Sequence, residues 1–304
     1  MKISEFSEKS EHSEFSEFSQ KATKQITHNT QLMKKLFWVF LAAILMTGCT
    51  GNKQQPTAEA TDWANTVVYE MNVRQYTPEG TFAAAQRELP RLKELGIDVV
   101  WLMPIYPIGV EGRKGTLGSY YAIKDYTDIN PEFGTMDDFD HFIATAHSLG
   151  FKILLDWVAN HTARDAKWLQ TKPADWYERE SDGTAKVPWD WTDTAKLNYA
   201  NHDVWRGQIK AMRFWVEQHN IDGFRCDMAM LVPIEFWQEA SYVLHSIKPD
   251  IFFLAEAEEL NLFDHAFDAS YAWDIHHMMC DIAGGARRVW DLRNTLYADR
   301  EKYP

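Results

Sequence analysis

Cysteine and positive charge are both scarce in this chain. Only three cysteines occur among 304 residues, and they are widely spaced with no metal-ligand pairing, so neither a disulfide framework nor a cysteine metal site is indicated. Lysine and arginine number 31 against 44 aspartates and glutamates, which gives a formal net charge of −13. No basic face emerges, and binding to a phosphate backbone needs one. A nucleic-acid partner is therefore not expected.

Two further absences narrow the class of protein. No glycine-rich phosphate loop follows any of the apolar strands described below, which argues against the runner-up fold, an open doubly wound sheet. Several converging histidines or carboxylates, as a metal-dependent barrel hydrolase requires, are also missing, since only His161 offers itself. With 45% hydrophobic and 25% charged residues, the composition is otherwise that of an ordinary globular protein.

The first 32 residues show no core-forming pattern. Residues 4–19 read SEFSEKSEHSEFSEFS, which is too polar and repetitive to build a packed interior. We interpret residues 1–32 as a mis-called extension and expect the true start at Met33.

Residues 33–48 have the form of a secretory signal peptide. Two lysines follow Met33, an apolar run covers residues 36–46, and Thr-Gly precedes Cys49; the run is too short to span a bilayer as a mature helix. The Thr-Gly-Cys end resembles a bacterial lipoprotein box. That resemblance implies a lipid anchor at Cys49 and a place in the bacterial cell envelope, either periplasmic or surface-exposed. The alternative is an ordinary signal peptide with an incidental cysteine. Residues 49–62 read as a polar tether.

From residue 67 onward, apolar strands alternate with amphipathic helices. Residues 162–202 break this rhythm, being rich in Trp, Asp, Thr and Pro, and are interpreted as a short inserted subdomain. The alternation predicts an α/β protein, a parallel (β/α)8 barrel of the triosephosphate-isomerase type over residues 63–304, with about six of eight strands present. The predicted strands are 67–73, 97–103, 151–157, 221–227, 251–256 and, more weakly, 266–273.

Two of these strands end in an acidic residue. The runs GFRCD at 223–227 and FLAE at 253–256 have the form of buried strands that deliver a carboxylate at their carboxyl ends. Arg225 and Asp227 point the same way on a strand, and an Arg beside a carboxylate nucleophile keeps it ionised. Glu256 could then protonate a leaving oxygen, since two carboxylates about 5–5.5 Å apart equip a retaining glycosidase. A structural Arg–Asp pair and a solvated Glu are the alternative.

Three segments in register resemble the α-amylase family, glycoside hydrolase family 13. DWVANH at 156–161 ends the third strand, GFRCD ends the fourth, and Glu256 ends the fifth. Their order, their spacing and the insertion after the third strand agree with the family from about residue 67 to the end of the chain. The resemblance implies retaining hydrolysis of α-glucosidic bonds in starch, maltodextrin or pullulan-like glucans in carbohydrate metabolism.

The resemblance also implies roles for the matching residues. Asp227 would be the nucleophile that forms a covalent glycosyl-enzyme intermediate. Glu256 would be the general acid and then the base, a role that needs a raised pKa. The resemblance implies that Arg225 would hold Asp227 ionised and that His161 would bind the sugar hydroxyls. Tyr121 would stack on the sugar, and Asp156 would be a structural acid.

Calcium is a further expectation of the resemblance. The family often binds a structural Ca²⁺ between the barrel and the inserted subdomain through the Asn of its first signature, here Asn160. Asp193 would be an oxygen partner of the type that Ca²⁺ favours. Asp and Asn in such a loop are also common turn formers, and the chemistry itself requires no cofactor.

The chain departs from the family pattern in two places. Met230-Leu231 stands where many α-amylases have Lys-His, so contacts on the leaving-group side must differ. The Asn-His-Asp signature near the seventh strand, which supplies a third acid, is missing. A six-stranded barrel has two open edges, so we expect low stability and interpret the chain as an incomplete gene product. The alternatives are a transglycosylase or a sucrose- or trehalose-type enzyme of the family, or an inactive truncated glycan-binding relative.

Overall fold

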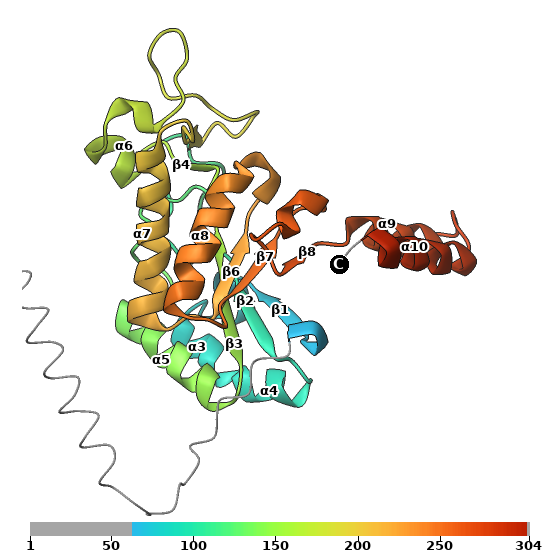
Figure 1. Ribbon diagram of the computed structural model, residues 1–304. Coiled ribbons are helices and arrows are strands. Elements are labelled where there is room, and N and C mark those ends of the chain that lie inside the picture. Colours follow the sequence, from blue (N-terminus) through green and yellow to red (C-terminus); the bar gives the residue numbers. More distant parts are fainter. Residues whose placement is uncertain (1–62, 303–304) are drawn as a thin grey trace, which may run out of the picture. The chain divides into compact units, whose positions relative to one another are not determined.

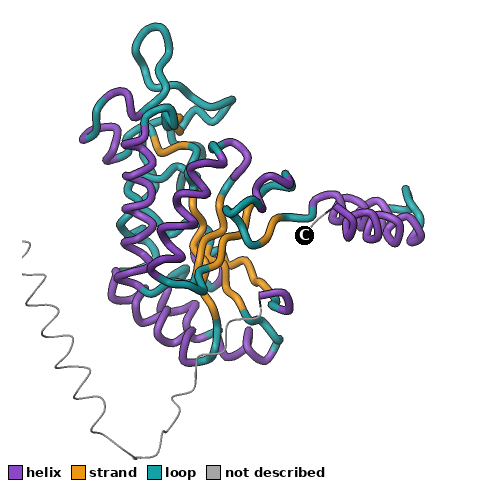
Figure 2. The backbone as a smooth tube through the Cα atoms, in the orientation of Figure 1, coloured by secondary structure: helices purple, strands orange, loops and turns teal. Residues whose placement is uncertain are grey.

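The computed structural model describes residues 63–302 (Figure 1). A single sheet of six parallel strands forms its centre, and Figure 2 shows the strands side by side with helices α3, α5, α7 and α8 of Figure 1 on one side of them. The predicted signal peptide, Cys49 and the tether lie outside the described residues. Among residues 63–302, no helix is long and apolar enough to cross a membrane.

The strands follow one another across the sheet in the order β1-β2-β3-β6-β7-β8, and every neighbouring pair is parallel. This curled sheet with helical crossovers is a partial (β/α)8 barrel, which confirms the predicted fold class. The strands are β1 (Val68–Met71), β2 (Val99–Leu102), β3 (Lys152–Trp157), β6 (Gly223–Cys226), β7 (Phe252–Ala255) and β8 (Ala269–Ser270).

The crossover helices lie where apolar residues recur at helical spacing. Thr135 begins α5 with a capping box to Asp138, and Asn220, at φ 53°, ends α7 in the left-handed conformation that favours Asn after Gly. The helices are α3 (Phe82–Arg87), α4 (Leu89–Glu94), α5 (Met136–Ser148), α7 (His202–His219) and α8 (Ile234–Ile247). Short 3-10 turns are found at Trp63–Asn65, Ala174–Trp176, Ala229–Leu231 and Leu260–Phe263.

The main core fills the space between the sheet and these helices. Large aromatic side chains dominate it: Phe139 of α5 meets Trp215 of α7 edge-on at 5.4 Å between ring centroids, and Trp157 meets Phe224 in the same way. A smaller apolar cluster lies on strands β2, β3 and β7, where Trp63 stacks on Phe252 at 4.2 Å.

The inserted segment forms its own small sheet. Strand β4 (His161–Ala163) pairs antiparallel with β5 (Thr194–Lys196), and α6 (Lys167–Thr171) lies between them in the sequence. Because β4 begins only four residues after β3 ends, the insertion is joined closely to the carboxyl end of the barrel.

Two stretches differ from the predicted elements. The predicted first strand is too long: β1 ends at Met71, and α2 (Val73–Tyr76) begins where apolar residues alone suggested more strand. After the two-residue β8, the chain forms α9 (Trp273–Ala283) and α10 (Val289–Lys302), which pack on each other. Neither helix was expected from the sequence, because their apolar residues do not make a long buried stripe.

A buried aspartate joins the amino ends of β3 and β6 to the carboxyl ends of α5 and α8. Asp222 is 2% exposed and precedes β6. It accepts a hydrogen bond from the Ile153 N–H at 2.9 Å and lies 2.7 Å from His147 Nε2 and 2.9 Å from Lys248 Nζ. Burial alone would raise the pKa of Asp222, but the His147 bond, the Lys248 charge and the Ile153 N–H outweigh burial and hold that pKa well below its usual range.

We expect Asp222→Asn to lower the free energy of unfolding at pH 7 by about 3 kcal/mol, because it removes one charge from a buried ion cluster. The pKa of Asp222 is lower in the folded chain than the usual value of about 3.9. Its contribution is therefore complete above that value and is lost as the pH falls towards the folded pKa. Urea unfolding at pH 7 and pH 3 measures both effects, with the exposed Asp264→Asn as control. An equal difference at both pH values would contradict the linkage.

Candidate active site

Three carboxylates converge on one arginine at the carboxyl end of the sheet. Asp156 lies on β3, Asp227 directly follows β6, and Glu256 directly follows β7. The Arg225 atom Nη1 lies 2.9 Å from Asp156 Oδ1 and 3.2 Å from Asp227 Oδ1. Its other terminal nitrogen, Nη2, lies 2.7 Å from Glu256 Oε2. One guanidinium therefore holds three acids from three adjacent strands.

Strand register explains this convergence. Asp156 and Arg225 are direct partners in the β3–β6 ladder, and side-chain alternation places Asp227 on the same face as Arg225. Gly223 allows β6 to run close to β7, because a Cβ built there would lie 2.1 Å from the Phe252 carbonyl oxygen. A larger residue would push the two strands apart and separate Arg225 from Glu256.

Two aromatic residues hold the guanidinium from its sides. The Arg225 Cζ atom lies 4.7 Å from the centroid of the Trp101 ring and 5.6 Å from that of Tyr271. Arg225 Nε donates a hydrogen bond to Tyr271 Oη at 3.1 Å, and Trp101 Nε1 donates one to Asp156 Oδ2 at 3.2 Å. Neither ring was expected at the site from the sequence. Trp101 has the pattern of a core residue on an all-apolar strand, and Tyr271 lies within the weakest predicted strand, 266–273.

The two aspartates share a single guanidinium, which is too little positive charge for both of them to ionise in their usual range. Burial raises the pKa of Asp156 to about 6, despite the opposing Arg225 charge. Burial and the charge of Asp156 also raise the pKa of Asp227 well above its usual value, again against Arg225. The expectation that Arg225 holds Asp227 ionised is therefore too simple. Arg225 acts in that direction, but Asp156 and Asp227 compete for it and titrate together.

The other predicted sugar-site residues meet at the same place. A cavity of about 340 Å³ is lined by Tyr121, His161, Arg225, Asp227 and Glu256, among others. Asp156 is buried behind them and binds Arg225, which suits the expected structural acid.

Tyr121 and His161 are both fixed by contacts. The Tyr121 hydroxyl donates to Asp156 Oδ2 at 3.3 Å. The His161 ring packs against Trp191 with 5.2 Å between centroids. Burial lowers the pKa of His161 to about 4, so its imidazole is neutral at pH 7 and offers one donor and one acceptor.

Asn160 and Asp193 do not fit one shared calcium site. The β4–β5 register continues to Leu197, whose N–H donates to Asn160 O, and to Arg164, whose N–H donates to Asp193 O. These pairs are four strand steps apart, roughly 13 Å. Among residues 63–302, no group of three or more His, Cys, Asp or Glu side chains is arranged to hold a metal. Calcium stays a prediction that this pair does not support, and no chemical step below uses it.

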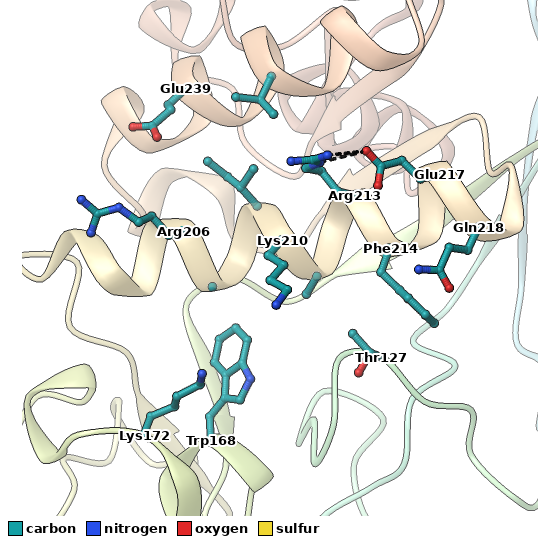
Figure 3. Close-up of a pocket in the computed structure, with 14 residues that line it drawn as sticks. Thr127, Trp168, Lys172, Arg206, Lys210, Arg213, Phe214, Glu217, Gln218 and Glu239 are labelled. Atoms are coloured by element: carbon teal, nitrogen blue, oxygen red, sulfur yellow. Dashed lines mark hydrogen bonds and ion pairs between the residues drawn. The ribbon is translucent and has the colours of Figure 1, made fainter. Parts of the chain in front are cut away.

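A larger cavity, of about 710 Å³, lies along the outer face of α7. Figure 3 shows Trp168 and Lys172 on one side of that helix and Glu239 on the other, with Arg213 paired to Glu217 on the helix itself. Its lining residues include none of the acids at the strand ends. The smaller cavity is therefore the candidate active site, as expected for the carboxyl end of a parallel barrel.

Comparison with known proteins finds relatives of this chain. Residues 59–195 match the family model described as "Alpha amylase, catalytic domain". The chain is similar to the alpha-amylase MalA of Haloarcula japonica, with 34% identity over 192 residues that cover 60% of this chain and 28% of that protein. It is also similar to an alpha-1,4-glucan:maltose-1-phosphate maltosyltransferase of Streptomyces coelicolor, with 34% identity over 202 residues, covering 60% of this chain and 30% of that protein.

A solved structure shows the same architecture. The crystal structure of an alpha-amylase from Lactobacillus plantarum superposes with a TM-score of 0.75 and 37% identity, covering 79% of this chain and 60% of that one. The chain spans less than a third of the length of the two curated relatives named above. The matched sequence and the shared barrel show, as the three strand-end segments predicted, that this chain belongs to the α-amylase family.

Proposed function

We propose that this site cleaves α-glucosidic bonds of starch- or maltodextrin-type glucans with retention of configuration. The observation that supports this best is that Asp227 and Glu256 line one cavity and are both bound by Arg225. A retaining glycosidase needs two such carboxyl groups on opposite sides of the scissile bond. Membership of the α-amylase family supports a glucan with α-linkages as the substrate.

In the proposed reaction, an Asp227 oxygen attacks the anomeric carbon as the bond to the leaving sugar oxygen breaks, and Glu256 gives its proton to that oxygen. Glu256 then takes a proton from water, whose oxygen displaces Asp227. The Oε2 atom of Glu256 accepts the Met228 N–H at 2.9 Å and contacts Arg225. Its Oε1 atom is therefore the one that would carry the proton.

Glycosyl transfer is a second candidate for the same site. A maltosyltransferase is as similar to this chain as the alpha-amylase is, with 34% identity in each case. In transfer, a sugar hydroxyl replaces water in the second step, while Asp227 and Glu256 keep their roles. Chromatography of the products from maltoheptaose separates the two candidates, because transfer yields chains longer than the starting sugar.

We expect Asp227→Asn and Glu256→Gln each to reduce turnover of maltoheptaose about 10³-fold or more, because one removes the nucleophile and the other the transferable proton. Reducing-sugar release and product chromatography measure hydrolysis and transfer together. Asp274→Asn, an exposed acid on α9, serves as the control and should keep the parent rate. If either active-site variant turned over maltoheptaose at the parent rate, the assignment would fail. If the parent chain bound maltoheptaose without turning it over, it would be a glycan-binding relative.

We expect the acid limb of kcat/KM to lie above the usual pH range of a carboxyl group, because Asp227 must be ionised to attack and burial together with the charge of Asp156 raises its pKa. Asp156→Asn removes a negative charge next to Asp227. The acid limb should then move to lower pH by about one unit, although the rate itself decreases. A pH profile of both proteins measures the shift, with Asp274→Asn again as control. An unchanged or higher midpoint in Asp156→Asn would refute the charge coupling.

We further propose that Cys49 carries a lipid that anchors the protein in a bacterial envelope, on the sequence pattern alone. In bacterial cells, Cys49→Ser should lose labelling by radioactive palmitate and move from the membrane fraction to the soluble fraction. Cys280→Ser, which changes an exposed cysteine of α9, should keep both. Retention of the label in Cys49→Ser would disprove anchoring at this residue.

A further inference from the structure

An aromatic pair extends outward from the candidate active site. Trp191 lines the cavity and packs on His161, with ring centroids 5.2 Å apart. Trp189 packs in turn on Trp191, with centroids 4.7 Å apart and the rings tilted by 51°. The Trp189 side chain is 62% exposed. A continuous set of ring surfaces therefore leads from the buried sugar-site histidine to solvent.

The chain holds Trp189 in this exposed place at a cost. Its φ of 50° lies in the left-handed region, which is sterically unfavourable for a residue other than glycine. An exposed indole also forgoes the gain from burying a large apolar ring. The turn is closed by a hydrogen bond from the Trp191 N–H to the Pro188 carbonyl at 3.1 Å. Strain of this kind persists only where the surroundings enforce it.

A second loop also supports the turn. Lys114 Nζ donates a hydrogen bond to the Asp190 carbonyl at 2.9 Å. Gly112, at φ +67°, approaches so closely that a Cβ there would lie 3.0 Å from the Thr192 carbonyl oxygen. Lys114 also lines the cavity. Two loops about 75 residues apart in sequence thus meet at the rim and fix the aromatic pair.

We propose that Trp189 and Trp191 form an additional saccharide-binding position, which takes a further glucosyl ring of the α-glucan whose bond is cleaved inside the cavity. This inference rests on the proposed function. A cavity of about 340 Å³ is at the small end of ligand sites, so a longer glucan has to leave it across the rim. The apolar C–H faces of a pyranose ring match an indole face, and the Lys114 ammonium supplies a hydrogen-bond donor beside it.

The surroundings of the pair favour a neutral ligand. At the exposed rim, Lys114 brings one positive charge and Asp190 one negative charge, so neither sign predominates there. An uncharged sugar with a hydroxyl rim and apolar faces suits that mixture, whereas a strongly anionic or cationic ligand does not. Because Trp191 belongs both to the cavity and to the pair, the same glucan chain reaches both.

Calorimetric binding of maltotriose and maltoheptaose tests the proposal on the full chain carrying Glu256→Gln, which prevents turnover. Adding Trp189→Ala should weaken maltoheptaose binding about 5- to 10-fold, because one ring-stacking contact is lost. Maltotriose binding should not change, since the short sugar fits within the cavity. Trp189→Phe keeps an aromatic face and should recover most of the affinity for maltoheptaose.

Trp290→Ala is the matched control, because Trp290 on α10 is 61% exposed and its removal deletes an equally exposed indole elsewhere. Equal weakening for both sugars, no weakening for maltoheptaose, or the same loss in Trp290→Ala would overturn the proposal. A Trp189→Ala protein that fails to fold leaves the decision to Trp189→Phe, where a full loss of the maltoheptaose preference also overturns it.

Hydrolysis by the parent chain, measured separately, distinguishes this inference from the proposed function. Length-dependent binding that requires Trp189, in a chain that cleaves nothing, would support the rim site and refute the proposed reaction. Cleavage of maltoheptaose without any dependence of binding on Trp189 would refute the rim site alone. A chain that neither binds nor cleaves the glucan would refute both.

Discussion

The rest of the site depends on a single buried guanidinium. Arg225 binds Asp156, Asp227 and Glu256 at once, and Trp101 and Tyr271 hold it from the sides. With one positive group and three acids, the cluster has a net negative charge even when one of the acids is protonated. Such a field suits a reaction whose transition state builds positive charge on a sugar ring. The arginine therefore both orders the acids and leaves the site net negative.

The sheet, and not the loops, places these groups. Adjacent parallel strands lie about 4.8 Å apart, and Asp156, Arg225 and Glu256 come from three neighbours in strand order. That spacing is what one planar guanidinium can bridge. Gly223 preserves it where β6 and β7 run closest. Precision of this kind comes from backbone hydrogen bonds that hold whether or not a ligand is bound.

The strands and the two catalytic acids could be predicted from the sequence, but the residues that hold the acids in place could not. Asp227 and Glu256 could be found because each closes an apolar run at a strand end, where parallel barrels carry their chemistry. Tyr271 gives no such signal, because it reaches Arg225 only through the curl of the sheet. The separation of Asn160 from Asp193 depends on the β4–β5 register, which a loop of mixed composition does not reveal. Met228 contributes only its backbone N–H, and a backbone contact cannot be predicted from the type of side chain.

Strand β4 begins at His161, a residue that lines the cavity, and this couples the insertion mechanically to the candidate active site. His161 is at once the last residue of the DWVANH segment that follows β3 and the first residue of the small antiparallel sheet, paired with Lys196 across the ladder. Because a hydrogen-bonded strand pair is stiff along its length, the insertion and the His161 imidazole move together. A tilt of the insertion, caused by a changed loop length or by a ligand bound at its far end, would therefore displace the His161 ring that lines the cavity.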